Sequence, residues 1–273
     1  MTISDIRIYI SMITAACTLC ACEKELDFRY HDIAPINVIE SYVSDEGMQT
    51  IITETTPVDE PMNTTRMTDA KVVISDIDNG KSWQLQPDSR GIYTCDETGI
   101  ENHNYLIEVE RDGKHFSASA VMLPPTRISS LSFSWIKMPY DYVAALEVSF
   151  EENPAIDGEY YWVRIYRNGE PYRWSATDDR FADGKGKLSL VFRTSRRDIS
   201  EEDENEVLRE GDIVSAGVTP ISHSMYEYLE ALTSGNSNGP HMFEGDLCLG
   251  YFIAGSTSKA SVVYDPENIP YAN

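Results

Sequence analysis

Positive charge is scarce in this chain of 273 residues. Lysine and arginine together number 22 against 45 aspartates and glutamates, which gives a formal net charge of −23. Such a surface repels the phosphate backbone of nucleic acids, and it repels anionic lipid headgroups as well. The composition therefore predicts no nucleic-acid partner, and any membrane attachment has to come from something other than protein charge.

The apolar run from Ile8 to Leu19 is too short to cross a bilayer, which requires about 20 residues. Its length is that of the apolar region of a secretory signal peptide, and small residues follow it. The run ends in Leu19-Cys20-Ala21-Cys22, which matches a Leu-x-Ala-Cys box whose cysteine receives lipid. We expect residues 1–21 to be a lipoprotein signal peptide, Cys22 to be acylated, and residues 22–35 to form a tether.

Two alternatives to this interpretation stay open. Cys17 follows Thr14-Ala15-Ala16 and is a competing cleavage point, and the apolar run could instead be a buried N-terminal strand. The leucine of the box favours Cys22. Several acyl chains on one cysteine anchor a protein stably. We therefore expect a protein tethered to the outer membrane, on its surface or on its periplasmic face.

Few cysteines remain after such processing. Cys17 and Cys20 lie in the segment that would be removed, which leaves Cys95 and Cys248. An export compartment permits disulfides, but separation in sequence does not define the geometry that a bridge requires. A single disulfide and two buried free thiols both remain open.

Catalytic signatures are scarce as well. The His-Glu-x-x-His pattern of zinc proteases is absent, and the five histidines never fall at ligand spacing on one predicted element. His223 and His241 flank a predicted helix and its loop, so they could meet in space. Acidic residues are so numerous that chance carboxylate pairs are expected. The sequence predicts no catalytic residue and no cofactor.

Strand patterns fill residues 36–123. Alternating or β-branched runs flank turn-forming residues, and each such pair indicates a hairpin. The runs are 36–43 and 49–56, 70–75 and 81–86, and 105–111 and 114–122, with turns at Ser44–Gly47, Asp78-Asn79-Gly80 and Asp112-Gly113. Three hairpin signals in about 90 residues are typical of an immunoglobulin-like β-sandwich.

Pro124 and Pro125 interrupt the strand pattern, so a domain boundary is predicted there, with a bent connection inside one larger sandwich as the alternative. Residues 126–273 are again rich in strands, and period-two alternation places Tyr161, Val163 and Ile165 on one strand face. We expect a second sandwich-like domain. It includes a helix near 224–234, begun by a Ser224–Glu227 capping box and ended by Gly235.

Two loops gather the oxygen donors that calcium prefers. Asp76-Ile77-Asp78-Asn79-Gly80 resembles the start of an EF-hand loop, but position 87 is proline where the loop requires a bidentate glutamate. A hairpin turn is favoured there. The second loop supplies Asp178, Asp179 and Asp183 as weak calcium candidates, with a polar hairpin as the favoured alternative.

Aromatic residues crowd the second half of the chain and provide the candidate binding residues. Tyr160, Trp162, Tyr172 and Trp174 lie on two predicted strands that flank the Asn168-Gly169 turn. Tyr160 and Trp162 oppose the predicted core face, so they are either covered by the helix or left as a binding platform. Coverage as part of the core is favoured.

The sequence resembles the bacterial outer-membrane lipoprotein family known as domain of unknown function 4249 (DUF4249). The matching stretches begin at Cys22, Val38, Tyr166, Met225 and Leu249. The resemblance implies an anchored lipoprotein often encoded beside a TonB-dependent outer-membrane receptor, and it supplies no catalytic residue. We therefore expect a non-catalytic binding component of an uptake system. A structural or adhesive envelope protein is the alternative, and a glycan-active hydrolase is less favoured.

Overall fold

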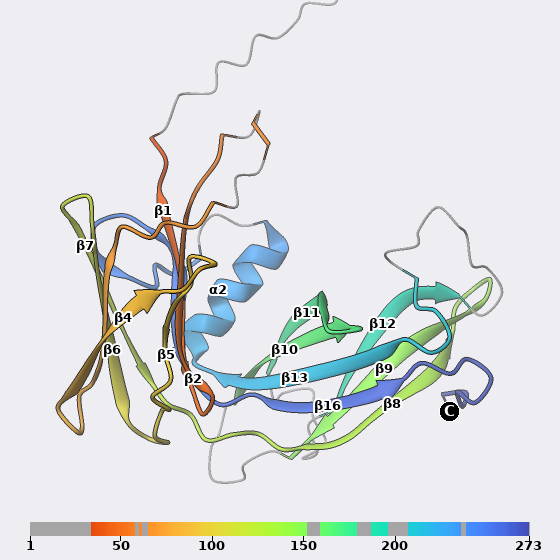
Figure 1. Ribbon diagram of the computed structural model, residues 1–273. Helices are drawn as coiled ribbons and strands as arrows, with labels where there is room; N and C mark the ends of the chain where they lie inside the picture. The colour runs from red at the N-terminus through yellow and green to blue at the C-terminus, as the bar shows by residue number, and fades with distance from the viewer. Residues whose placement is uncertain are drawn as a thin grey trace, which may run out of the picture. The chain divides into compact units, whose positions relative to one another are not determined.

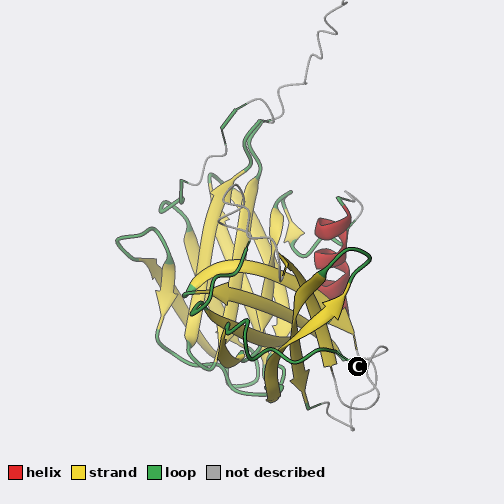
Figure 2. Cartoon of the chain, turned by 90° about the vertical axis from the view of Figure 1, so that its right-hand side faces the viewer, coloured by secondary structure: helices red, strands yellow, loops and turns green. Residues whose placement is uncertain are grey.

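Strands dominate the described part of the chain because buried and solvent-facing residues alternate along most of its segments. The computed structural model describes residues 34–57, 60–61, 65–151, 159–178, 187–195, 207–235 and 239–272. Within these ranges it contains sixteen strands and one helix, α2 (Figure 1 and Figure 2). The predicted signal peptide, Cys22 and most of the predicted tether lie outside the described residues.

Nine strands form the first sheet, in the order β14-β7-β6-β3-β4-β5-β2-β1-β15. It packs on one apolar core, to which both its early strands and β15 contribute. The strand bounds are β1 Asn37–Ser44, β2 Gly47–Glu54, β3 Lys71–Asp76, β4 Lys81–Pro87, β5 Tyr93–Cys95, β6 Asn104–Arg111, β7 Lys114–Val121, β14 Glu244–Gly245 and β15 Leu249–Ala254.

The parallel pairing of β15 with β1 joins distant parts of the sequence. Val38 lies opposite Leu249, and Val43 lies opposite Ala254. Gly250 permits this close approach, since its φ is +106° and a Cβ atom there would lie 1.9 Å from the carbonyl oxygen of Ile39. Strands β14 and β15 therefore complete the first sheet although they follow Pro125. The division into domains 36–123 and 126–273 stays a prediction.

The remaining strands form two smaller sheets around a second apolar core. One sheet has the order β11-β10-β13-β16 and the other has the order β12-β9-β8. Their bounds are β8 Ile128–Lys137, β9 Tyr142–Phe150, β10 Tyr160–Arg167, β11 Glu170–Asp178, β12 Lys187–Ser195, β13 Ile213–Ile221 and β16 Ser258–Val263. Tyr161, Val163 and Ile165 all point into this core, as predicted. The predicted all-β sandwich fold with one short helix is confirmed.

Two of the hairpin turns have the predicted form. Asp112-Gly113 and Asn168-Gly169 are two-residue turns with positive φ at both positions. The turn at Asn79-Gly80 differs, because Asp76 pairs with Lys81 and leaves four residues in the loop. The carboxylate of Asp76 accepts the backbone N–H groups of residues 78 and 79, which favours this wider loop over the two-residue turn that is typical of Asn-Gly.

Helix α2 spans His223–Ser234 and packs through Met225 and Leu229. The predicted capping residue is wrong by two positions. Ser222, not Ser224, is the N-cap, and its hydroxyl accepts the backbone N–H of Met225 over 3.2 Å. Gly235 ends the helix with a φ of 64°, as predicted. No helix in the described ranges is long and apolar enough to cross a membrane.

Candidate functional site

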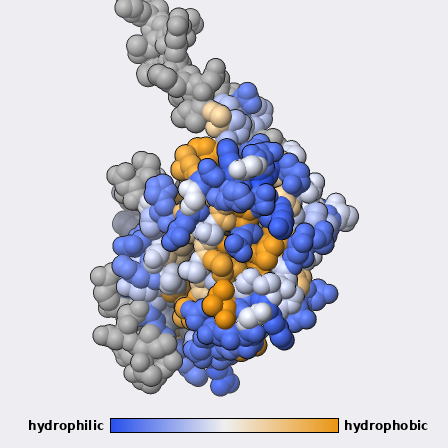
Figure 3. Space-filling view, turned by 90° about the vertical axis from the view of Figure 1, so that its left-hand side faces the viewer, coloured by the Kyte–Doolittle hydropathy of each residue, from blue (hydrophilic) through white to orange (hydrophobic). Residues whose placement is uncertain are grey.

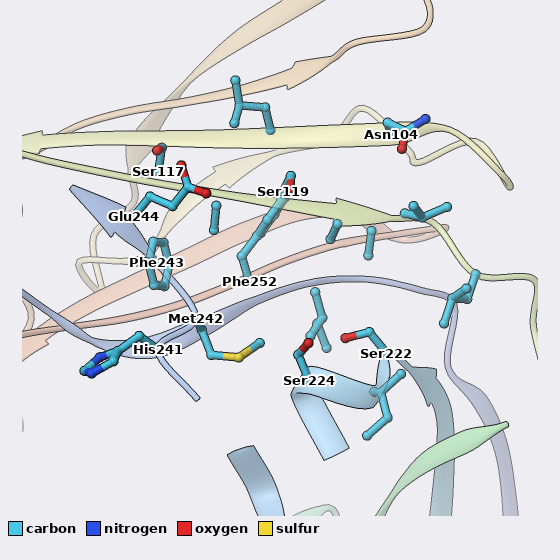
Figure 4. A pocket seen from close by; sticks show the side chains of 18 residues that line it. Asn104, Ser117, Ser119, Ser222, Ser224, His241, Met242, Phe243, Glu244 and Phe252 are labelled. Atoms are coloured by element: carbon cyan, nitrogen blue, oxygen red, sulfur yellow. The ribbon is translucent and has the colours of Figure 1, made fainter. Parts of the chain in front are cut away.

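A groove of about 600 Å³ lies between β7, β15 and the start of α2 (Figure 4). Its volume is within the range of small-ligand sites. The apolar part of its lining includes Leu106, Val121, Leu123, Met242, Phe243 and Phe252. Hydroxyl groups come from Ser117, Ser119, Ser222 and Ser224.

The ends of β7 and β15 define the length of this groove. Near one end, Leu123 donates its backbone N–H to the carbonyl of Ala254 over 3.3 Å, and Leu123 and Gly255 form a parallel bridge. At the other end, β14 pairs with Phe116 and Ser117 of β7.

Between these ends, β7 presents an unpaired edge. The N–H and C=O of Met122 bond to the β6 side of the sheet, at His103 and Asn102. Because these groups alternate in direction along a strand, those of Ser119 and Val121 point to the other side, toward the groove. On that side, no strand of the described chain pairs with β7 at either residue, whose partners on β6 are Leu106 and Asn104.

Charge is almost absent from the groove. Glu244 and His241 are the titratable residues among those that line it. The space-filling view from the side of β6 and β7 shows hydrophobic residues gathered in the middle of that face, with hydrophilic residues around them (Figure 3). In a chain with a net charge of −23, a charge-poor groove is a surface that a neutral or apolar segment can cover at low desolvation cost.

Tyr160 and Trp162 do not form an open binding platform. Both are half-buried in a small apolar cluster with Met225 and Leu229 of α2. The Tyr160 ring lies 4.9 Å from the rings of both His223 and Tyr226. The helix thus covers this strand face, which was the favoured interpretation.

A register shift between β10 and β11 leaves Tyr172 without a partner on β10, whereas Trp174 lies opposite Arg164. Tyr172 packs against the second core, and its ring is stacked on that of Phe192 with centroids 5.6 Å apart. Trp174 remains 41% exposed. The four predicted aromatic residues are therefore not brought into one exposed patch, and a binding role for them stays a prediction.

Of the second predicted calcium loop, only Asp178 falls within the described residues, and it is buried. Asp179 and Asp183 lie outside them. In the first loop, Asp76, Asp78 and His103 place ligand-type atoms within 4.8 Å of one another. The sequence did not reveal His103, because the register of β3 against β6 brings it close.

All three side chains already form hydrogen bonds within the turn or beside it. Asp76 accepts bonds from two backbone N–H groups, from the Asn79 amide and from His103 Nδ1, at 2.9–3.1 Å. Asp78 accepts the backbone and side-chain N–H groups of Asn104. Burial raises the pKa of Asp76, but these bonds outweigh it and hold the pKa below its ordinary value. The loop is thus a hydrogen-bonded hairpin turn, the interpretation that the sequence favours.

The two remaining cysteines are free thiols in the structure. Cys248 is buried in the first core, and burial raises the pKa of its thiol to about 12. Such a thiol is unreactive and behaves as a small apolar side chain. His241 lines the groove, whereas His223 lies against Tyr160.

One Gly-x-Ser-x-Gly pattern is present, at residues 235–239. In a nucleophile elbow this pattern follows a strand and precedes a helix. Here Gly235 is the C-cap of α2, so the pattern follows a helix. Ser237 itself lies outside the described residues. The pattern therefore lacks the context of a hydrolase nucleophile.

Comparisons with known proteins give no functional assignment. No family model matches the chain, and no curated protein matches it. Among solved structures, a two fibronectin type-III domain segment from chicken tenascin is similar at 13% identity and a TM-score of 0.24. The match covers 84% of this chain and 99% of that chain. A cytokine receptor complex is similar at 11% identity and a TM-score of 0.25, over 70% of this chain and 86% of that chain.

Proposed function

We propose that this chain is a lipid-anchored outer-membrane lipoprotein that binds an extended segment of a protein partner in the groove between β7 and β15. The anchor is Cys22, as the Leu-x-Ala-Cys box predicts. The observation that carries the binding proposal is the unpaired edge of β7 at Ser119 and Val121, which borders a groove of about 600 Å³.

Strand β14 supports this mode of binding from within the protein. It pairs antiparallel with Phe116 and Ser117, at one end of the groove. A partner segment would continue the same line along Ser119 and Val121, with main-chain hydrogen bonds for affinity and the apolar lining for alternate side chains. Strand addition of this kind is a common way to recognise an extended peptide.

The resemblance to the lipoprotein family suggests the identity of the partner, a TonB-dependent outer-membrane receptor. A non-catalytic role is consistent with the groove, which holds one carboxylate, that of Glu244. A glycoside hydrolase of the usual kind requires a pair of carboxylates. The chain would then act as an accessory subunit of an uptake complex.

The test is to extract the native protein from its own membrane with mild detergent and to identify what accompanies it. We expect labelling by radioactive palmitate and a receptor in stoichiometric amount. The Cys22→Ala variant should lose both the label and the membrane fraction. Recovery of the labelled lipoprotein alone would contradict the accessory role and favour a structural or adhesive one. Absence of label in the wild type would contradict the anchor.

A further inference from the structure

Among the described residues, Arg164 has no carboxylate partner, although the protein is strongly acidic. It lies on β10, on the face opposite Val163 and Ile165, which point into the second core. Its Nη2 donates to the hydroxyl oxygens of Thr219 and Thr257, each over 3.0 Å. Its guanidinium carbon lies 4.6 Å from the centre of the Trp162 ring. These three contacts fix the plane of the guanidinium.

The remaining donors of Arg164 are unused within the described residues. Nε is buried and has no hydrogen-bond partner, and Nη1 makes no bond to another described side chain. An unpaired buried donor such as this Nε–H is costly, and within the described residues the half-buried guanidinium is hydrogen-bonded only to neutral hydroxyl groups. The arrangement is that of a preformed anion receptor rather than of a completed ion pair.

A small cavity of about 140 Å³ opens beside this guanidinium. The β1–β2 hairpin supplies one wall, through Tyr42, Ser44 and Glu46. Strands β10 and β16 supply the other, through Arg164, Tyr166 and Lys259. Lys259 Nζ stands at the rim, bonded to both oxygens of Glu46 at 2.8 and 2.9 Å.

The charges around the cavity select the kind of anion. Arg164 and Lys259 contribute two positive charges, and Asp45 and Glu46 contribute two negative ones. A dianion such as phosphate would be repelled by the two acidic side chains of the lining. A carboxylate carries a single negative charge and would interact mainly with the guanidinium. Nη1 of Arg164 keeps two N–H donors for such an anion, since both N–H groups of Nη2 bond to Thr219 and Thr257.

We propose that the cavity beside Arg164 binds a carboxylate group, either of a small organic acid or of the C-terminus of a peptide. Arg164 donates to the carboxylate oxygens, Thr219, Thr257 and Trp162 hold the guanidinium in place, and Lys259 adds charge at the entrance. This site has no residue in common with the groove except Ile253, and it does not depend on the proposed function.

The test is calorimetric titration of the full chain with acetate at neutral pH. We expect acetate to bind the wild type, and Arg164→Met to weaken that binding by about tenfold or more, since bonds to a charged group are lost. Arg173→Met is the matched control. Arg173 stacks on Tyr172 and Phe192 instead, so this variant should bind acetate as the wild type does.

A second variant keeps the proposal testable if Arg164→Met does not fold. Glu46 is exposed and competes for Lys259, so Glu46→Gln should tighten acetate binding by about two- to fivefold. If Arg164 had a purely structural role, Glu46→Gln would leave the affinity for acetate unchanged. Absence of acetate binding by the folded wild type, or equal binding by folded Arg164→Met, would overturn the proposal.

Two further probes identify the source of the carboxylate. A dipeptide with a free C-terminus that binds more tightly than acetate, together with no binding of its C-terminal amide, would support a peptide terminus. Acetate binding at least as tight as that of the dipeptide would support a small acid. Inorganic phosphate binding more tightly than both would overturn the assignment to a carboxylate.

Discussion

The backbone nitrogen of Leu123 lies 3.3 Å from the carbonyl oxygen of Ala254, and this hydrogen bond joins the segment after β7 to the end of β15. Beyond it, β7 and β15 no longer pair, and the groove begins where the pairing ends. The groove is therefore built into the topology of the sheet, as the place where a nearly closed sheet stays open.

A charge placed in the groove should abolish partner binding. Val121 is 46% exposed on the β7 edge, so Val121→Asp is expected to fold and to lose the co-purifying partner, because a carboxylate there would be desolvated. Val263→Asp is the matched control, since Val263 is an exposed strand valine outside the groove. Equal recovery of the partner with both variants would show that the groove is not the docking surface.

Gly250 should be irreplaceable in the β1–β15 pairing. A Cβ atom would lie 1.9 Å from the Ile39 carbonyl oxygen, so Gly250→Ala is expected to lower the free energy of unfolding by about 3 kcal/mol or more. Gly169→Ala has a positive φ but nothing within 4 Å, and it should cost only about 1–2 kcal/mol. Urea denaturation measures the loss in free energy of unfolding for both variants. Similar losses would mean that the structure relieves the contact of the added Cβ atom at little cost in free energy.

Asp76 should make the protein sensitive to acid. Its pKa is lowered in the folded state, so its stabilising contribution is present above the unfolded pKa and is lost as the pH falls through the folded pKa, below 3.8. Asp76→Asn should lower the free energy of unfolding at neutral pH by about 1–3 kcal/mol and flatten its decline in acid. The measurement is urea denaturation from neutral pH to pH 3.

The exposed Asp96→Asn serves as the control for that series. It should behave as the wild type does at every pH. If Asp76→Asn declined in acid as steeply as the wild type, the acid sensitivity would have to come from other carboxylates.

Arg111 should be the most important charged side chain of the first sheet. It is nearly buried and donates to Asn37, Glu54 and Asp69, at 2.6–2.8 Å, so it links β1, β2 and the segment before β3. Removal of one partner leaves uncompensated polar groups, and Arg111→Met is expected to cost about 3–5 kcal/mol.

Arg90→Met provides the comparison for Arg111. Arg90 pairs with Asp88 at the surface, so its loss should cost at most about 1 kcal/mol. Thermal and urea unfolding distinguish the two variants. Equal stability of the Arg111 and Arg90 variants would show that the Arg111 network contributes little.

The capping of α2 can be tested directly. Ser222→Ala should lower the free energy of unfolding by about 1 kcal/mol, because the Met225 N–H loses its acceptor. Ser224→Ala should have little effect, although the sequence pattern favours Ser224 as the cap. A larger loss of stability in Ser224→Ala than in Ser222→Ala would instead support the predicted Ser224–Glu227 capping box.

Local patterns predicted the local structure well. Asp112-Gly113 and Asn168-Gly169 form the expected turns, and the alternation of Tyr161, Val163 and Ile165 identified the core face of β10. These features depend on φ preferences and on a period of two, both of which are written in a few consecutive residues.

The long-range features were not predictable in this way. Nothing near Leu249 indicates that it pairs with Val38, and nothing near His103 indicates that it reaches Asp76. The groove and the Arg164 cavity both depend on such pairings, since each has walls from segments far apart in sequence. Their residues carry no motif, and only the assembled sheet reveals them.

The position of β15 in the first sheet has a consequence for how the chain folds. Strand β1 obtains its second neighbour only after residue 254 has been synthesised, so a growing chain cannot complete this sheet from its early segments alone. Such non-local pairing slows folding, because the entropy of closing a long loop is lost before the contacts that offset it have formed. Until β15 has been made, one edge of β1 therefore remains without its strand partner.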